Sequence, residues 1–192
     1  MRVVIGITGA SGAIYAKRLI EFLHKKHTLF VTISKHAKSI FEYETGVNFF
    51  DFIKTKDVEY FDNGDLYSPV ASGSFKIDAC CIVPCSMKTL SSIANGFSDS
   101  LISRCADVAI KEKRKLVVVP RETPFSSIHL ENMLKLSNLG VYITVASTAF
   151  YNKPQTLEDV VDFVVGRILD NLGIDNSLYK RWEGKNSTNI EL

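Results

Sequence analysis

The chain opens with the stretch RVVIGITGASG at residues 2–12, and this stretch decides the fold. Its first part, Arg2–Thr8, is mostly β-branched and apolar, which predicts a buried strand. The glycines of Gly6–Gly12 allow a sharp turn, and Ala13–Lys25 then has apolar residues at helical spacing. The start of such a helix offers free N–H groups and the positive end of its dipole to an anion. The turn therefore predicts a site that helps to hold a phosphorylated cofactor.

Strands and helices alternate along the rest of the chain. Further strands are predicted at Thr28–Ser34, Asp78–Pro84, Leu116–Pro120 and Val141–Ala146, and helices at Lys35–Glu44, Ser86–Ala94, Ser98–Lys113, Ile128–Leu139 and Thr156–Asp170. The segment Tyr60–Phe75 is predicted to be a loop or hairpin. Near-continuous apolar strands between helices are typical of a parallel sheet covered on both faces. We therefore expect an α/β protein, a Rossmann-like (flavodoxin-like) three-layer sandwich with a parallel sheet, whose ligands lie beyond the carboxyl ends of the strands.

Length and composition describe an ordinary globular protein. The 192 residues are 46% hydrophobic and 23% charged, which suits one large domain. We expect a single domain at 1–184 and a polar tail at 185–192. The net charge of +2 is too small to argue for nucleic acid or an anionic membrane. No apolar run reaches the length of a membrane span, so the expected location is the cytoplasm.

The four cysteines are predicted to be small core residues in a reducing compartment. Cys80, Cys81 and Cys85 lie in or just after one apolar run, and Cys105 lies in a predicted helix. Cys81 and Cys85 lack a second Cys/His pair at zinc spacing, so no metal site is expected.

The spacing of the first turn favours a mononucleotide. The turn reads G-x-x-G-x-x-G, whereas dinucleotide sites use G-x-G-x-x-G. The second strand ends in Ser34-Lys35, where an NAD enzyme would carry an acidic residue for the ribose. A tight turn with no ligand remains the alternative on this pattern alone.

Two later strand ends resemble the first. The third apolar strand runs into Ser86-Met87-Lys88-Thr89, and the second strand places Ser34 at an equivalent position. Serine and threonine are common helix N-caps, so each alone is more often structural. Their coincidence on the edge that binds ligands favours a phosphate site.

A polar cluster is expected beyond the same edge. Its members are Arg104, Lys111, Arg121, Glu122, Tyr151 and Arg167. Arginine, lysine and tyrosine together suit a phosphate or diphosphate leaving group. A solvated helix face is an equal alternative for Lys111, whereas Arg167 lies among apolar residues and needs a partner. The histidines, the lack of G-x-S-x-G and the lack of H-E-x-x-H argue against a hydrolase, and Glu44 would be a surface residue.

An ordered set of motifs resembles the UbiX/Pad-type flavin prenyltransferases, within the flavin-containing decarboxylase-like family. The motifs are GITGASG at 6–12, SKHA at 34–37, PCSMKTL at 84–90, VVPRETPF at 118–125, HLENML at 129–134 and DVVDFV at 159–164 leading to Arg167. The resemblance runs from Arg2 to about Trp182.

This resemblance implies a reaction that the residues alone do not. Such enzymes bind reduced FMN and dimethylallyl phosphate, attach the prenyl group to flavin N5 and close a further ring through C6. The product, prenylated FMN, serves a partner decarboxylase of the UbiD type. No metal is needed, and the family forms homo-oligomers, often dodecamers.

The resemblance also assigns roles to residues of this chain. FMN would be held by Gly9, Ala10, Ser11, Ser34, Ser86, Met87, Lys88, Thr89 and Arg121. The prenyl phosphate would be held by Arg104, Lys111, Glu122, Tyr151, Arg167 and Trp182. The residues expected to act in catalysis are Ser11, Glu44, Lys111, Glu122, Tyr151 and Arg167. Among these, Glu44 and the departing phosphate are candidate proton carriers, and Ser11 would lie near N5.

Two other functions stay open at this point. One is an FMN-dependent cysteine decarboxylase-like enzyme of the same fold, against which the segment Arg121–Pro124 argues. The other is a non-catalytic FMN-binding protein, which would not need the polar cluster. The choice between a monophosphate and a diphosphate donor also stays open.

Overall fold

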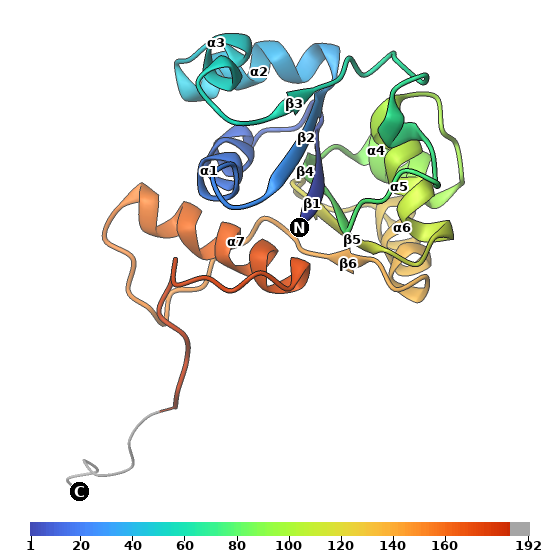
Figure 1. Ribbon diagram of the computed structural model, residues 1–192. Helices are drawn as coiled ribbons and strands as arrows, with labels where there is room; N and C mark the ends of the chain where they lie inside the picture. The colour runs from blue at the N-terminus through green and yellow to red at the C-terminus, as the bar shows by residue number, and fades with distance from the viewer. Residues whose placement is uncertain (185–192) are drawn as a thin grey trace, which may run out of the picture.

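A computed structural model describes residues 1–184, so the predicted tail at 185–192 lies outside the described residues. The elements in chain order are β1 (Arg2–Ile7), α1 (Ala13–Leu23), β2 (Thr28–Ile33), α2 (Lys35–Thr45), α3 (Phe49–Lys54), β3 (Glu59–Tyr60), the 3-10 helix η1 (Pro69–Ala71), β4 (Ala79–Cys85), α4 (Met87–Ala94), α5 (Leu101–Lys111), β5 (Lys115–Pro120), α6 (Ser127–Asn138), β6 (Tyr142–Ile143) and α7 (Leu157–Leu172). Figure 1 shows them as one sheet between helices.

The sheet has six parallel strands in the order β3-β2-β1-β4-β5-β6. The central strand β1 pairs with β2 and β4, so that Ile5 lies between Val31 and Cys81. This is the strand order of the doubly wound Rossmann fold, in which the winding reverses between β1 and β4. The predicted α/β sandwich with a parallel sheet is confirmed, and the reversal marks the edge where a ligand is expected.

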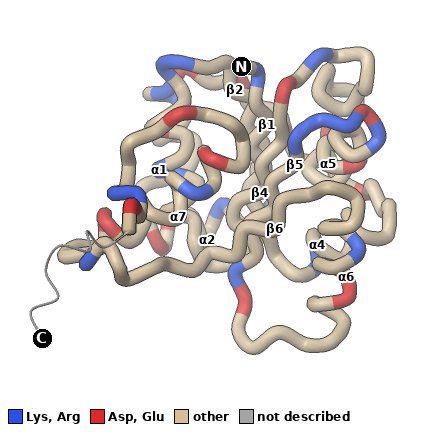
Figure 2. Tube along the Cα trace, turned by 90° about the horizontal axis from the view of Figure 1, so that it is seen from below, with Lys and Arg blue, Asp and Glu red and all other residues tan. Residues whose placement is uncertain are grey.

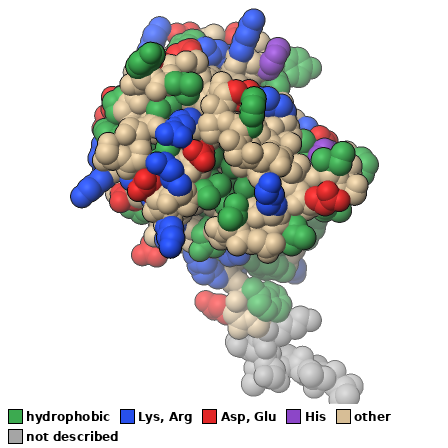
Figure 3. Space-filling model, turned by 90° about the vertical axis from the view of Figure 1, so that its right-hand side faces the viewer, with side chains coloured by type: hydrophobic (Ala, Val, Ile, Leu, Met, Phe, Trp, Pro, Cys, Tyr) green, Lys and Arg blue, Asp and Glu red, His purple; other side chains and the backbone are tan. Residues whose placement is uncertain are grey.

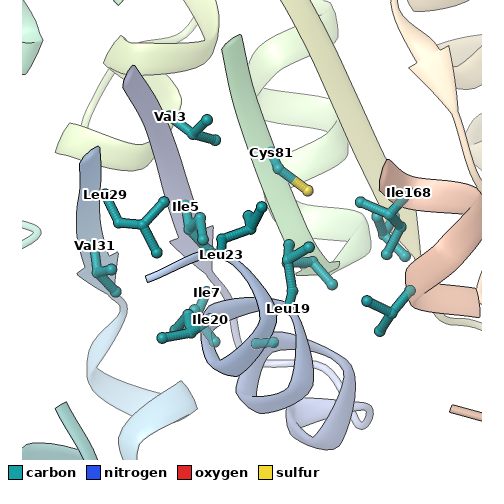
Figure 4. Packing of buried hydrophobic residues seen from close by; sticks show 14 of the residues in the cluster. Val3, Ile5, Ile7, Leu19, Ile20, Leu23, Leu29, Val31, Cys81 and Ile168 are labelled. Carbon is teal, nitrogen blue, oxygen red and sulfur yellow. The ribbon is translucent and has the colours of Figure 1, made fainter. Parts of the chain in front are cut away.

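Helices cover both faces of the sheet, as Figure 1 shows. Alternate strand residues point to opposite faces, and Ile5 and Cys81 pack on the face covered by α1 and α7. Figure 4 shows Leu19 and Leu23 of α1 and Ile168 of α7 meeting these strand residues. The other face packs against α4, α5 and α6. All four cysteines are buried and free, which confirms that they are core residues.

The long predicted elements are present, whereas several short ones differ. The segment predicted as a loop or hairpin starts within the two-residue strand β3 and contains η1, and α3 was not predicted. The strand predicted at Val141–Ala146 is reduced to Tyr142–Ile143. Helix α5 begins at Leu101 instead of Ser98, because Ser100 and Ser103 form a capping box.

Charges are distributed around the molecule. Figure 2 shows Lys and Arg interspersed with Asp and Glu along the chain trace, as the small net charge of +2 would suggest. Within residues 1–184, no helix combines the length and the apolar character needed to cross a membrane.

Candidate functional site

The fold itself favours glycine at two positions of the stretch Gly6–Gly12. Gly12 has a φ of 116°, in the region that favours glycine, and a Cβ at Gly6 would lie 2.8 Å from the Cδ1 atom of Ile82. A Cβ at Gly9 would make only an ordinary contact of 3.4 Å with the Cβ atom of His36. Packing therefore favours glycine at position 6 and backbone conformation favours it at position 12, whereas Gly9 is exposed and borders a cavity.

The start of α1 is already occupied by a carboxylate. Glu44 Oε2 accepts hydrogen bonds from the backbone N–H groups of Gly12 at 2.9 Å and Ala13 at 2.8 Å. These are among the N–H groups that the sequence offered to an anionic ligand, and here a carboxylate of the protein itself accepts their hydrogen bonds. Glu44 is half-buried rather than a surface residue. Its carboxylate ties the end of α2 to the start of α1.

A buried hydroxyl joins the two strand ends at the switch point. Thr8 Oγ1 donates to the carbonyl oxygen of Pro84 at 2.8 Å and accepts from the N–H of Ser86 at 2.7 Å. Sequence analysis missed Thr8, because a threonine at a strand end gives no sign of a partner 76 residues away. It fixes the position of Ser86, the N-cap residue of α4.

A cavity of about 430 Å³ opens at this switch point. Five of the predicted FMN residues line it: Gly9, Ser34, Ser86, Lys88 and Thr89. The remaining lining residues, which sequence analysis did not select for the site, are Thr8, His36, Asn63, Ser100 and Ile102. A larger cavity of about 590 Å³ opens near Met1 and Thr28, where strands begin, and is not a candidate on this topology.

The two helix starts at this cavity differ in their caps. Ser86 Oγ accepts from the N–H of Thr89 at 3.4 Å, and so caps α4. Ser34 stands at the N-cap of α2, yet within the described residues its side chain makes no capping hydrogen bond. The hydroxyl of Ser34 and the first N–H groups of α2 are therefore available to an anion.

Lys88 is paired with an acidic residue at the rim of this cavity. Its Nζ lies 2.9 Å from Asp99 Oδ2. The hydrogen bond from Lys88 lowers the pKa of Asp99 below its usual value. The lysine side chain is 70% exposed, so the pair is a surface one and contributes little to stability.

Asn63 closes another side of the cavity. Its Oδ1 accepts from the N–H of Ile102 at 3.1 Å, and its carbonyl oxygen accepts from the N–H of Leu101 at 2.8 Å. These bonds fasten the loop before η1 to the start of α5. The loop had no assigned role in the sequence, and the structure makes it a wall of the cavity.

A second cavity, of about 350 Å³, lies on the other side of the first turn. It brings together Ser11, Glu44 and Arg121, and adds Tyr15, which sequence analysis missed. Arg121 Nε donates to the carbonyl oxygen of Ser11 at 3.2 Å. Burial raises the pKa of Tyr15, and nearby Arg121 partly opposes this. One cavity is therefore lined by a cation, a carboxylate and the hydroxyl groups of Ser11 and Tyr15.

A third group of predicted residues lies along α7. The ring of Tyr151 makes edge contacts with Phe163 at 6.0 Å and with Trp182 at 5.6 Å between centroids. Arg167 Nη1 lies 3.0 Å from Asp170 Oδ2, which supplies the partner that its apolar neighbours required. Tyr151 and Trp182 line a cavity of about 430 Å³.

Two predicted residues do not join the others. Arg104 and Lys111 lie two turns apart on α5; Arg104 Nε donates to the carbonyl oxygen of Ala71, and Lys111 packs beside Gly73. Lys111 ends α5 just before β5 begins. Lys115, the first residue of β5, is aligned through Ala79 with Val3, so this end of the sheet is the one near the N-terminus. The expectation that Lys111 lies beyond the carboxyl edge is therefore wrong within one chain, because α5 runs antiparallel to β5.

Three remaining candidates have modest local contacts. Glu122 follows Arg121 and accepts from the N–H of Thr123 at 3.0 Å. Ala10 lies in the first turn, where its N–H donates to the carbonyl oxygen of Thr8. Met87 is half-buried and packs against the core on the α4–α6 face.

The first cavity fits the phosphate end of a mononucleotide. It offers an uncapped helix start at Ser34, a second hydroxyl cluster at Ser86 and Thr89, and the exposed backbone of Gly9. These donors suit a phosphate, and the glycine permits close approach of a ligand to the backbone.

Comparison with known proteins gives a consistent result along the chain. The family model described as flavoprotein matches residues 1–169. The chain is 56% identical over 182 residues to a protein named flavin prenyltransferase UbiX from Methanocaldococcus jannaschii. The aligned region covers 95% of this chain and 98% of that protein.

Two solved structures are similar along nearly their whole length. One is AnUbiX (PadA1) in complex with FMN and dimethylallyl pyrophosphate, with a TM-score of 0.91, 42% identity, and coverage of 96% of this chain and 98% of that one. The other is a dodecameric FMN-dependent UbiX-like decarboxylase from Escherichia coli O157:H7, with a TM-score of 0.92, 42% identity, and coverage of 96% and 100%.

Proposed function

The chain belongs to the flavoprotein family and, within it, to the UbiX flavin prenyltransferases, and from this premise we propose that it joins the dimethylallyl group of dimethylallyl phosphate to N5 and C6 of reduced FMN. The observation that carries this function is the 56% identity to a UbiX flavin prenyltransferase over 95% of the chain. The similar AnUbiX structure contains FMN and dimethylallyl pyrophosphate together, which supports FMN and a phosphorylated dimethylallyl donor as the two substrates.

We propose that the cavity at the switch point holds the FMN phosphate. Ser34 would bind it with its hydroxyl and with the first N–H groups of α2. Ser86 and Thr89 would add hydroxyl groups from the start of α4. Gly9 and Ala10 would line the path of the flavin, and Met87 and Lys88 would form the wall beside it.

Reduced FMN, when bound, supplies the nucleophilic N5 and C6 atoms. The chain has to promote cleavage of the allylic C–O bond, whose electron pair leaves with the phosphate. Arg121, Arg167 and Tyr151 are cationic or hydroxyl donors suited to stabilise the charge that grows on the phosphate oxygens. Glu122 would orient these donors, and the faces of Trp182 and Tyr151 would stabilise the allyl cation.

Glu44 is proposed as the proton carrier. Its Oε2 atom already accepts two N–H groups at the start of α1, and it shares a cavity with Arg121, Tyr15 and Ser11. A carboxylate held in this way is fixed in position near the first turn, where it could accept the proton released at N5. Ser11 would orient the reacting atoms beside it.

We also propose that a second copy of the chain completes the phosphate site. Arg104 and Lys111 lie on α5, apart from Tyr151, Arg167 and Trp182. The similar Escherichia coli protein is described as dodecameric. The outer surface of α6 has exposed apolar side chains, with Ile128 65%, Leu130 54% and Leu134 63% exposed, and Figure 3 shows hydrophobic groups on this side. Such a surface suits burial against another copy.

The product, prenylated FMN, is proposed to pass to a UbiD-type decarboxylase. We also propose that the enzyme works in the reducing cytoplasm as one FMN-binding domain at 1–184, because its four cysteines are buried free thiols.

The decisive experiment measures the mass of the flavin. The protein is incubated anaerobically with reduced FMN and dimethylallyl phosphate, and the bound flavin is then analysed by mass spectrometry. We expect a mass increase corresponding to one added C5 unit; an unchanged flavin from folded, FMN-loaded protein would refute the function. Arg167→Ala and Glu122→Gln should lose turnover and keep bound FMN, and full activity in both would refute the proposed substrate site.

A further inference from the structure

One carboxylate on α7 holds four side chains. Asp170 accepts from Arg167 Nη1 at 3.0 Å and Tyr179 Oη at 2.7 Å. It also accepts from Arg181 Nη2 at 2.7 Å and Asn176 Nδ2 at 3.0 Å. The side chain of Asp170 is only 16% exposed, so these bonds replace its lost contact with water.

Three of these partners belong to the segment after α7, residues 174–184, here named the C-terminal strap. Within the described chain this strap has no helix or strand, so side-chain contacts hold it. The ring of Tyr179 lies 5.0 Å from that of Phe163 between centroids, and Asn176 Nδ2 donates to the carbonyl oxygen of Gly166 at 3.2 Å. A Cβ at Gly166 would overlap the Tyr179 ring. The strap is therefore seated closely on one face of α7.

The same contacts link the strap to the candidate substrate residues. Phe163, Arg167 and Asp170 share one face of α7, because they are spaced by four and three residues. Phe163 touches Tyr151, and Trp182 at the end of the strap touches Tyr151 from another side. Asp170 thus binds both Arg167 and the C-terminal strap through hydrogen bonds.

Two guanidinium groups converge on Asp170. Arg167 and Arg181 share this carboxylate, and their side chains are 49% and 52% exposed. Asp175 is a second carboxylate that acts on Arg181, so the cluster carries no clear excess of positive charge. The shared carboxylate orients both guanidinium groups, and their exposed N–H groups can donate to an anionic ligand.

We propose that Asp170 is a positioning residue for the prenyl phosphate: it fixes Arg167 for that phosphate and seats the C-terminal strap so that Trp182 closes against Tyr151. This inference rests on the proposed function, because it assigns Arg167, Tyr151 and Trp182 to the substrate site. Asp170 itself touches no substrate in this scheme.

The test uses the single tryptophan of the chain, Trp182. Its side chain is already 60% exposed, so the emission colour would change little, whereas its anisotropy reports whether the ring is held. In Asp170→Asn we expect fast local motion of Trp182 to increase. The KM for dimethylallyl phosphate should rise roughly tenfold, as loss of a charged hydrogen bond predicts, while FMN affinity stays unchanged.

Asp162→Asn is the matched control. Asp162 lies on the same helix and accepts two hydrogen bonds from Arg18, at 2.6 Å and 3.0 Å, away from the strap. This variant also loses one ion pair, but it should keep the Trp182 anisotropy and the KM of the parent protein.

Unchanged anisotropy and unchanged KM in Asp170→Asn would overturn the proposal, and so would equal changes in both variants. If Asp170→Asn does not fold, Tyr179→Phe removes one donor to Asp170 while keeping the ring, and the same outcomes apply to it. If the parent protein makes no prenylated flavin, the proposed function fails, and the anisotropy still reports whether Asp170 seats the strap.

Discussion

At the scale of single residues, Thr8 shows how one hydroxyl can organise a ligand site. Thr8 is 2% exposed, and its hydroxyl bonds two backbone groups, the carbonyl oxygen of Pro84 and the N–H of Ser86. A buried hydroxyl with both its donor and an acceptor site in use is costly to remove, because the N–H of Ser86 then loses its partner and the carbonyl of Pro84 keeps only the N–H of Thr8. Here the partner N–H belongs to Ser86, a proposed ligand of the FMN phosphate.

We predict that Thr8→Val weakens both folding and FMN binding. Valine keeps the shape but leaves the carbonyl of Pro84 and the N–H of Ser86 without the hydroxyl, so the free energy of unfolding should fall by about 1–3 kcal/mol. Urea unfolding measures this loss, and quenching of flavin fluorescence measures FMN affinity. Thr8→Ser restores the hydroxyl and should bind FMN as the parent does. Equal affinity in the valine variant would show that Thr8 does not position Ser86.

At the scale of elements, the start of α1 explains what a glycine-rich turn can and cannot predict. The sequence identified the turn and the helix, because glycine spacing and apolar periodicity are local properties. It did not identify Glu44 as the partner of the N–H groups of Gly12 and Ala13, because a contact between residues about 32 positions apart depends on how α2 packs against α1. The N–H groups that suggested a phosphate are used by the protein itself.

The contact between α7 and the C-terminal strap has its own pH signature. Burial alone would raise the pKa of Asp170, but hydrogen bonds from Arg181 and Tyr179 outweigh burial and lower the pKa to about 2. A pKa lowered by folding stabilises the folded state above the unfolded value of about 4. That stability is lost as pH falls from about 4 towards 2.

We therefore predict a pH-dependent difference between the parent and Asp170→Asn. At pH 7 the parent should be more stable by about 2 kcal/mol, and the difference should shrink as pH falls below about 4. Urea unfolding of both proteins at pH 7, 5, 4 and 3 gives the two curves. A difference that stays constant down to pH 3 would mean that the Asp170 charge is not what holds the strap.

At the scale of the whole molecule, local sequence patterns predicted the sheet and the helices that cover it, but not every short element. The buried strands β1, β2, β4 and β5 are long apolar runs and were predicted nearly to their ends. The short elements α3 and β3 were missed, because a few residues carry no clear period and depend on packing for their conformation.

The candidate site was predicted in part for the same reason. Ser34, Ser86 and Thr89 directly follow strands, so topology alone brings them to one cavity. Lys111 was placed wrongly, because its distance from the ligand edge depends on the length and direction of α5. Asp170 gave no signal at all, since its partners Tyr179 and Arg181 lie beyond the end of its helix.

The separation of Lys111 from Arg167 leads to a prediction for the assembly. If α5 of one copy completes the phosphate site of another, Lys111→Ala and Arg167→Ala should each be inactive alone. Oligomers reassembled from both variants should regain activity, because some sites then pair an intact α5 with an intact α7. Random mixing in equal amounts would restore about a quarter of the sites, as expected when two different surfaces form each interface.

A mixture of Arg104→Ala and Lys111→Ala provides the control for this experiment. Both residues lie on α5, so every mixed site would still lack one of them and activity should stay absent. Prenylated flavin per protomer is measured by mass spectrometry, and subunit exchange is verified by the masses of the intact oligomers. Exchange without recovery in the first mixture would contradict a shared site and would require Lys111 to act, if at all, within its own chain. Recovery in the first mixture alone would mean that the cations of α5 and the arginine of α7, kept apart within one chain by the sheet, meet only between copies.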